Sequence, residues 1–128
     1  MNTPIKILVV DDEKGFLSLM GDVLTGLGYD IIQAEDGKQA REIVDSEPVD
    51  LIISDIFMPT MDGFRFHSYV REFSDGHDIP FIFVSGYDDE RTRGAIVDPE
   101  LDYFFPKSTP VENILSLIEK LANERKPA

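Results

Sequence analysis

Several features that would define a class of function are missing from this chain of 128 residues. It has no cysteine, which excludes disulfides, a thiolate nucleophile and a cysteine-based zinc site. No apolar run approaches the ~20 residues that span a bilayer, and the opening Met1-Asn2-Thr3-Pro4 lacks the basic and then apolar character of a secretory signal. Basic residues are scarce: 12 stand against 25 acids, and the net charge of −13 disfavours direct binding to nucleic acid or to a membrane. The length and these absences predict one acidic, soluble, cytoplasmic domain.

The sequence does contain five short apolar runs that alternate with longer amphipathic stretches. Each run is rich in Ile, Val, Leu or Phe and is too short for a buried helix, so each predicts a β-strand. The first, third and fourth are almost continuously apolar, as expected of strands that are covered on both faces. The runs are 5–10, 30–34, 50–54, 80–84 and 102–105.

Two of the amphipathic stretches predict helices with recognisable ends. In the first, apolar residues from Phe16 to Leu27 recur at helical spacing, and Gly28 follows as a stop signal. The last helix is predicted from residue 110 to about 123, with Thr109 as N-cap, Pro110 at the first helical position and Glu112 at the capping-box position. We expect a single domain with a core of about 5–121, followed by a frayed tail or linker start at 122–128.

Strands that alternate with helices in this way predict an α/β fold, a doubly wound parallel sheet with helices on both faces. Ligands of such sheets bind beyond the carboxyl ends of the strands. Every chemically capable group that follows a predicted strand should therefore lie on one rim of the sheet. These groups are Asp11, Asp12, Glu13, Asp55, Ser85, Gly86 and Lys107.

The rim residues suit a phosphoryl group carried on a carboxylate. Asp11, Asp12 and Asp55 repel one another when brought together, so they either raise their pKa values or hold a cation. Oxygen ligands without cysteine or convergent histidine suit a hard ion, Mg²⁺ or Mn²⁺. Lys107 and the Ser85 hydroxyl would supply a cation and a donor to the oxygens of an anion.

Each of these residues alone has an ordinary structural interpretation. Asp12 or Glu13 would serve as a cap of the first helix, and Ser85-Gly86 is typical of a turn. A lone lysine such as Lys107 is most often a solvated charge. Their convergence on one rim favours the functional interpretation. The two histidines, His67 and His77, have no metal-ligand pattern around them and are predicted to be structural or solvent-facing.

Four motifs, taken in order, resemble a bacterial response-regulator receiver domain of two-component signalling over about residues 5–121. The resemblance implies a chemotaxis-regulator-like, flavodoxin-like fold: a five-stranded parallel sheet of order 2-1-3-4-5 flanked by five helices. The motifs are Val9-Val10-Asp11-Asp12-Glu13, Ile53-Ser54-Asp55-Ile56-Phe57-Met58-Pro59 running into Met61-Asp62-Gly63, Phe83-Val84-Ser85-Gly86, and Tyr103-Phe104-Phe105-Pro106-Lys107.

The same resemblance implies roles for individual residues. Asp55 would be the phosphoacceptor. Asp12 and Asp55 would bind Mg²⁺ directly together with the backbone carbonyl of Phe57, and Asp11 would act largely through water. Ser85 and Lys107 would contact the phosphoryl oxygens.

Three further aromatic residues also receive roles from the resemblance. Phe104 matches the aromatic residue that turns inward when the hydroxyl residue moves toward the phosphate. Phe57 and Tyr87 stand two residues beyond Asp55 and Ser85, where the family flanks the path of hydrolytic water. Their bulk predicts slow self-dephosphorylation, and the alternative that both rings only pack against neighbours stays open.

Two departures from the family pattern carry structural predictions. Receivers usually have a proline after the lysine, joined by a cis peptide, whereas Ser108 follows Lys107 here. A non-proline cis bond costs ~2.5–4 kcal/mol, so we predict a trans peptide. Asp98-Pro99-Glu100 stands where a glycine commonly closes the fourth helix, which predicts a short or irregular helix and puts the usual dimerisation or output face in doubt.

The leading hypothesis is a phosphorylation-controlled signalling module and not an enzyme. Its expected partners are a sensor histidine kinase or phosphotransfer protein, and a downstream protein or an output domain outside this chain; a phosphorylation-dependent homodimer is also expected. One alternative is a degenerate receiver that binds partners without phosphorylation. The other is a haloacid-dehalogenase-type phosphatase, which is disfavoured because Phe57 stands where that enzyme needs a second acid.

Overall fold

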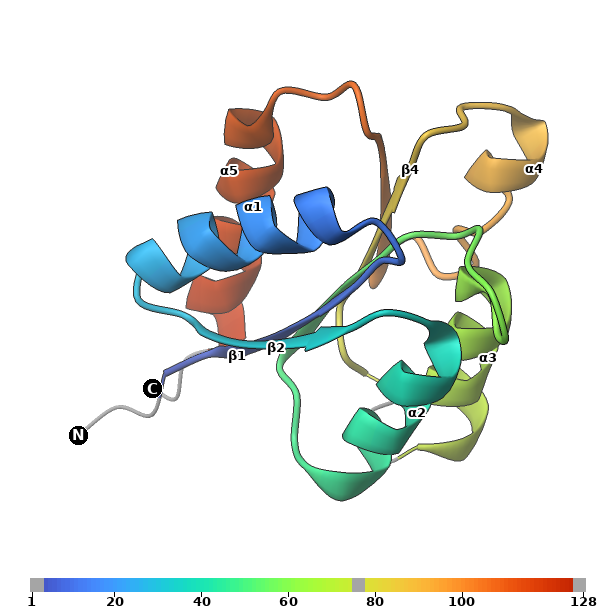
Figure 1. Cartoon of the computed structure of the whole chain (residues 1–128), viewed down its shortest axis with the longest axis horizontal. Coiled ribbons are helices and arrows are strands. Elements are labelled where there is room, and N and C mark those ends of the chain that lie inside the picture. The colour runs from blue at the N-terminus through green and yellow to red at the C-terminus, as the bar shows by residue number, and fades with distance from the viewer. Residues whose placement is uncertain (1–3, 75–77, 126–128) are drawn as a thin grey trace.

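We describe the protein from a computed structural model, in which residues 4–74 and 78–125 are placed (Figure 1). Strands and helices alternate along the chain. The strands are β1 (Lys6–Val10), β2 (Asp30–Ala34), β3 (Leu51–Ser54), β4 (Phe81–Ser85) and β5 (Asp102–Pro106). The helices are α1 (Lys14–Gly26), α2 (Gly37–Ser46), α3 (Gly63–Phe73), α4 (Glu90–Arg93) and α5 (Val111–Arg125).

The strands form one five-stranded parallel sheet in the order β2-β1-β3-β4-β5, which confirms the predicted topology. Val10 at the end of β1 is in register with Ala34 of β2 and Ser54 of β3. On the other side, Ser85 at the end of β4 is in register with Pro106 of β5. The carboxyl ends of the strands therefore lie along one edge of the sheet.

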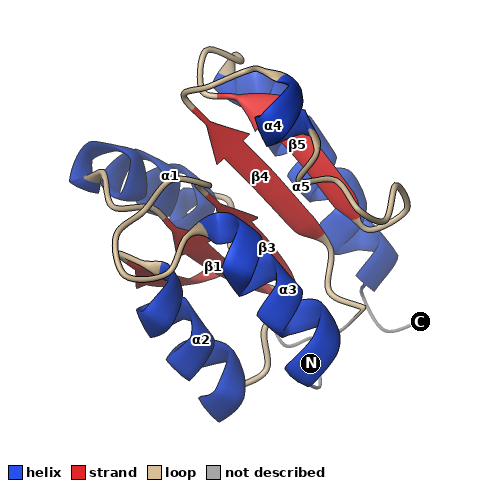
Figure 2. Ribbon diagram, turned by 90° about the vertical axis from the view of Figure 1, so that its right-hand side faces the viewer, coloured by secondary structure: helices blue, strands red, loops and turns tan. Residues whose placement is uncertain are grey.

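Helices cover both faces of the sheet (Figures 1 and 2). Alternate strand residues point to opposite faces, so Ile7 and Val9 join a core with α1 and α5, whereas Leu8 and Val10 join a second core with α2 and α3. All residues of β3 and β4 are buried. This confirms the prediction, made from their continuous apolar character, that both faces of these strands are covered.

The ends of α1 and α5 follow local sequence signals. Gly28 just beyond α1 has φ of +96°, in the left-handed region that favours glycine, and confirms the predicted stop. The last helix begins at Val111, one residue later than predicted, and continues to Arg125 because Leu121 and Ala122 are buried in the core. Residues 122–125 therefore belong to α5 and not to a frayed tail, and 126–128 lie outside the described residues.

The predicted weakness of the fourth helix is confirmed. α4 has only 4 residues, and a capping box between Asp89 and Thr92 caps its N-terminus. No cis peptide bond occurs among the described residues, so Lys107–Ser108 is trans as predicted. Over the same residues, no helix has the length and apolar character that crossing a membrane requires.

Candidate functional site

Backbone hydrogen bonds place the rim residues at the carboxyl edge of the sheet. The Asp55 N–H donates to the Val10 carbonyl at 2.8 Å, which fixes the start of the β3–α3 loop beside the end of β1. The Lys107 N–H donates to the Ser85 carbonyl at 2.7 Å, which places the residue after β5 beside the end of β4. The sheet thus brings together residues that are far apart in the sequence, as predicted.

Three carboxylates form an acidic cluster on this edge. Asp11, Asp12 and Asp55 each offer an oxygen, and the three oxygens lie within 4.8 Å of one another. Asp11 and Asp55 are buried, whereas Asp12 is exposed. Three carboxylate oxygens with one open side form a donor set that fits a hard divalent cation such as Mg²⁺, which prefers oxygen ligands and retains several waters.

The ammonium group of Lys107 lies among these acids. Its Nζ is 2.8 Å from Oδ2 of Asp11, 3.4 Å from Oε2 of Glu13 and 3.6 Å from Oδ2 of Asp55. The same ammonium lies 4.9 Å from the centre of the Phe16 ring. The sequence placed Glu13 on the rim and offered it as a helix cap, but it did not predict the contacts of Glu13 and Phe16 with Lys107. Local spacing does not show that the end of β5 reaches α1.

Burial and mutual repulsion shift the pKa values of the site. Burial, together with the nearby charge of Asp11, raises the pKa of Asp55 to about 6. Burial also raises the pKa of Asp11, although Lys107 opposes the shift. Burial opposes the charge of Lys107, but the hydrogen bond to Asp11 and the charge of Asp55 outweigh it and raise its pKa. One lysine therefore does not neutralise the charge of the cluster, and the remaining negative charge would attract a cation.

Glu13 occupies the N-cap position of α1, whereas the capping interpretation is wrong for Asp12. α1 begins after Glu13 without any side-chain cap. Oδ1 of Asp11 instead accepts a hydrogen bond from the Glu13 N–H at 2.8 Å. The exposed Asp12 carboxylate lies at the open side of the cluster, where it is accessible to a ligand.

The Ser85 hydroxyl does not contact Asp55 in this conformation. Ser85 is completely buried, and its Oγ accepts a hydrogen bond from the Tyr87 N–H at 3.1 Å. Phe104, two residues earlier in register along β5, is half-buried and packs against the core on the α2 and α3 side. Both side chains are thus near the site, and neither is engaged with the acidic cluster.

Phe57 and Tyr87 pack against each other beside the acidic cluster. Their rings meet edge to face with centroids 5.2 Å apart, and Tyr87 is 61% exposed. Phe64 extends the group, with its ring centroid 6.1 Å from that of Phe57. The Arg91 guanidinium lies 5.3 Å from the Phe57 ring centre and 5.7 Å from that of Phe64. The sequence did not predict the contacts of Phe64 and Arg91 with Phe57, since only the tertiary structure brings these side chains of α3 and α4 together.

His67 has the structural role that the sequence indicated. It is buried, and its Nε2 lies 2.8 Å from Oδ1 of Asp102. Arg71 contacts the same oxygen at 2.7 Å through Nη2. The other predicted structural histidine, His77, lies outside the described residues.

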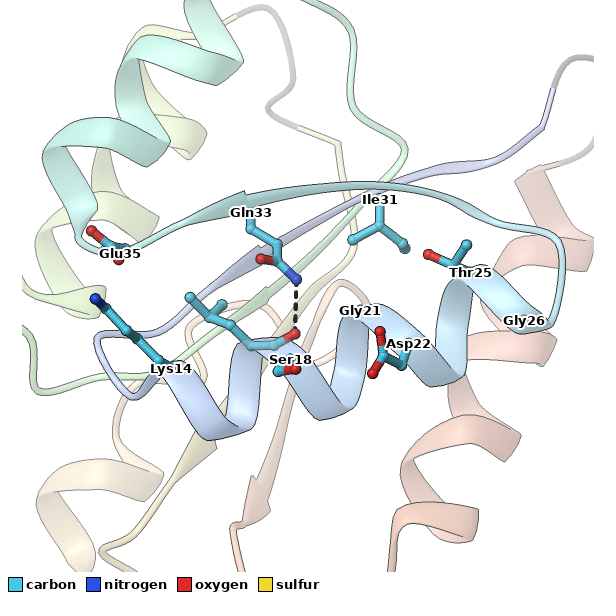
Figure 3. Close-up of a pocket in the computed structure, with 10 residues that line it drawn as sticks. Lys14, Ser18, Gly21, Asp22, Thr25, Gly26, Ile31, Gln33 and Glu35 are labelled. Atoms are coloured by element: carbon cyan, nitrogen blue, oxygen red, sulfur yellow. Dashed lines mark hydrogen bonds between the residues drawn. The ribbon is translucent and has the colours of Figure 1, made fainter.

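An open groove runs between α1 and the edge strand β2 (Figure 3). Across it, Nε2 of Gln33 donates to the Leu17 carbonyl at 2.8 Å. A Cβ at Gly21 would lie 2.4 Å from that nitrogen, so the glycine makes room for the bond. None of the metal-ligating or phosphoryl-contacting residues predicted from the sequence lines this groove. We interpret the hydrogen bond across it as a structural link between α1 and the edge strand β2.

A doubly wound sheet of this order with an acidic cluster and a lysine at its carboxyl edge defines the class of receiver modules. The sequence matches the response regulator receiver domain family over residues 7–119, and the chain belongs to that family. Receiver domains are signalling modules and not classical enzymes, and they bind Mg²⁺ at an acidic site.

Individual relatives agree with this assignment. The response regulator MprA of Mycolicibacterium vanbaalenii is 30% identical over 124 residues, which are 97% of this chain and 53% of that protein. The chain thus spans about half the length of the curated relatives it matches.

Solved structures of receivers also resemble this chain. The response regulator protein TrrA of Thermotoga maritima, solved in complex with Mg²⁺ and BeF, is 30% identical; the match has a TM-score of 0.79 and covers 91% of this chain and 98% of that one. A CheY-like receiver domain protein of Methanospirillum hungatei has a TM-score of 0.86 at 21% identity over 95% of this chain and 96% of that one, and this likeness shows the fold alone.

Proposed function

We propose that this chain is a phosphoacceptor receiver in which Asp55 takes a phosphoryl group from a sensor histidine kinase or phosphotransfer protein. The observation that carries the proposal is the position of the Asp55 carboxylate: its Oδ2 lies 3.6 Å from the Lys107 ammonium, and one of its oxygens lies within 4.8 Å of carboxylate oxygens of Asp11 and Asp12. Its Oδ1 is held by the Ile56 N–H at 2.8 Å, so the other oxygen is the one free to attack. As the new P–O bond forms, the P–N bond of the phosphohistidine breaks.

The other residues at the edge of the sheet would support this transfer. Asp12, Asp55 and the backbone carbonyl of Phe57 would hold Mg²⁺ or Mn²⁺ directly, with Asp11 acting through water. The bound ion supplies charge that stabilises the transferring phosphoryl group. Lys107 would turn from Asp11 to one phosphoryl oxygen. The Ser85 hydroxyl would leave the Tyr87 N–H and donate a hydrogen bond to a second phosphoryl oxygen.

The switch follows from that exchange. Movement of Ser85 toward the phosphate would draw the β4–α4 loop with it and vacate space that the half-buried Phe104 ring fills. The phosphoryl group biases an equilibrium between two conformations and need not create a new one. We propose that the changed surface is recognised in the cytoplasm by a downstream protein, by an output domain, or by a second copy in a phosphorylation-dependent homodimer.

Mass spectrometry after treatment with acetyl phosphate and Mg²⁺ tests the proposal. We expect a gain of one phosphoryl group that depends on Mg²⁺ and is lost in Asp55→Ala. Asp22→Ala, which removes an exposed acid of α1, serves as the control and should be phosphorylated like the parent. An unmodified parent protein would instead favour a degenerate receiver that binds partners without phosphorylation. We do not retain the haloacid-dehalogenase alternative, because the chain belongs to the receiver family and Phe57 provides no acid.

A further inference from the structure

A groove between α2 and α3 is not explained by the proposed phosphorylation chemistry. The two helices lie side by side on one face of the sheet (Figures 1 and 2). Between them is a groove of about 320 Å³ whose lining is mostly apolar or aromatic. The lining residues that matter here are Arg41, Met61, Phe64, Arg65, Tyr69 and Phe73.

Two aromatic rings of α3 form an exposed shelf at this groove. Tyr69 and Phe73 are stacked, with centroids 5.8 Å apart and planes 27° from parallel, and Phe73 is 72% exposed. Tyr69 is held in place because its hydroxyl donates to Asp45 and the Arg41 guanidinium lies 4.4 Å from its ring centre. A fixed aromatic surface of this kind offers large contact area at little cost in conformational entropy, as is typical of binding sites.

The charge of the groove is opposite to that of the chain. Among the described residues that line it, Arg41 and Arg65 are the only cations, and none is a carboxylate. Over residues 4–74 and 78–125, neither arginine has an ion pair, and Asp45 on α2 is engaged by Tyr69 outside the lining. In a chain of net charge −13, two guanidinium groups that lack a carboxylate partner among the described residues, one of them against the Tyr69 ring, complement an acidic partner.

We propose that the α2–α3 groove is a docking surface for an acidic segment of a partner protein that carries an aromatic or branched apolar side chain. The apolar side chain packs on Tyr69 and Phe73, and the flanking carboxylates pair with Arg41 and Arg65. Other occupants fit less well. A second copy docked through the same face would bring another set of the same lining residues, and those that the structure describes include no carboxylate for the arginines. A nucleic acid would be repelled by the net charge of −13.

Selection from a phage-displayed library of random peptides on the unphosphorylated full chain tests this proposal independently of Asp55. We expect the enriched peptides to combine acids with an aromatic residue or leucine, and to shift the amide NMR signals of Arg65, Ser68 and Tyr69. Their affinity, measured by fluorescence anisotropy, should fall about tenfold or more in the double variant Arg41→Glu/Arg65→Glu. Lys120→Glu, a charge reversal at an exposed position of α5, should bind like the parent.

A second variant keeps the test valid if the double reversal disturbs the fold. Phe73→Ser removes an exposed ring, so circular dichroism should be unchanged while peptide affinity falls. The proposal is overturned if no peptide is enriched, if the selected peptides lack acids, or if they bind parent and double variant equally. Sedimentation that shows dimers through this face, or binding of single-stranded oligonucleotides that the double variant loses, would assign the groove to another occupant and also overturn it.

Discussion

Asp55 stands in a position that makes its ionised form less favourable than that of an exposed carboxylate. It is 8% exposed, and its nearest charged neighbours include both the Asp11 carboxylate and the Lys107 ammonium. Burial and Asp11 together outweigh the attraction of Lys107, so the pKa of Asp55 rises to about 6. If Asp55 is the phosphoacceptor that we propose, its charge in such surroundings is kept at the expense of stability.

The pH dependence of stability in metal-free protein should show this cost. Because folding raises the pKa of Asp55 from 3.8 to about 6, ionised Asp55 destabilises the fold fully above pH 6, and the penalty disappears as the pH falls toward 3.8. In EDTA we expect Asp55→Asn to increase the free energy of unfolding by about 1–3 kcal/mol at about pH 8, with the gain vanishing near pH 4.

Urea denaturation at several pH values measures this difference. Asp22→Asn, an equal change of charge at an exposed position of α1, is the control and should leave stability within about 0.5 kcal/mol of the parent. An Asp55→Asn protein less stable than the parent at the alkaline end would contradict the physical account of the site.

The aromatic pair Phe57 and Tyr87 gives a second prediction at the residue scale. If these rings, 5.2 Å apart, obstruct water at the acyl phosphate, replacing one by a small polar side chain should admit it. We expect Phe57→Asn to accelerate loss of the phosphoryl group at least several-fold, measured by the decay of phosphorylated protein after removal of acetyl phosphate. Leu27→Asn, at an exposed position beyond α1, should decay like the parent. An unchanged rate in Phe57→Asn would mean that the rings only pack.

At the scale of elements, a buried polar network joins α3, β5 and the loop after α4. Oδ1 of Asp102 contacts His67 and Arg71, and its Oδ2 accepts from the backbone N–H groups of Val97 at 3.0 Å and Asp98 at 2.9 Å. Burial alone would raise the pKa of Asp102, but these hydrogen bonds outweigh it and hold the pKa well below its usual range. One carboxylate thereby anchors a loop whose helix, α4, has only 4 residues.

Removing that carboxylate should loosen all three elements. We expect Asp102→Asn to lower the free energy of unfolding by about 2–4 kcal/mol near pH 7, because His67, Arg71 and two N–H groups lose a shared charged acceptor. Hydrogen exchange at the Val97 and Asp98 amides should accelerate. Glu72→Gln, an exposed acid on the same helix α3, is the matched control. Equal stability of Asp102→Asn and this control would show that the network contributes little.

At the scale of the whole molecule, three carboxylates gather on one edge of a protein that already carries a net charge of −13. The parallel sheet imposes this arrangement, since the carboxyl ends of its strands share one edge. The fold therefore bears electrostatic repulsion that a divalent cation would relieve, and binding of the ion to the native state should stabilise it by mass action.

Thermal unfolding in MgCl₂ measures this stabilisation. At a free Mg²⁺ concentration ten times the Kd we expect a gain of about 1.4 kcal/mol, and the melting temperature should rise by several degrees. NaCl at matched ionic strength should give a smaller increase, and Asp12→Asn should lose most of the specific effect while Asp22→Asn retains it. If Mg²⁺ and NaCl act equally on the parent, the acidic cluster does not bind the ion.

Much of the architecture could be read from local patterns. The continuous apolar runs of β1, β3 and β4 identify strands buried on both faces, and Gly28 locates the end of α1 through its own backbone conformation. The short fourth helix was also predictable, although it ends at Arg93, well before Pro99. The position of Asp55, Ser85 and Lys107 at strand ends was predictable because each stands where an apolar run ends. By contrast, the prediction of a frayed tail from residue 122 was wrong for residues 122–125. These residues are helical because packing against the sheet extends α5 to Arg125.

By itself the sequence determined the order of elements, the parallel sheet and the residues that meet at its carboxyl edge, because short-range periodicity and strand direction suffice for these. Only the tertiary structure decided that Lys107 contacts Asp11 more closely than Asp55, that Ser85 bonds to Tyr87, and that Arg41 and Arg65 flank an aromatic groove. Those facts depend on side-chain directions and on distances between elements remote in the chain, which local spacing does not encode.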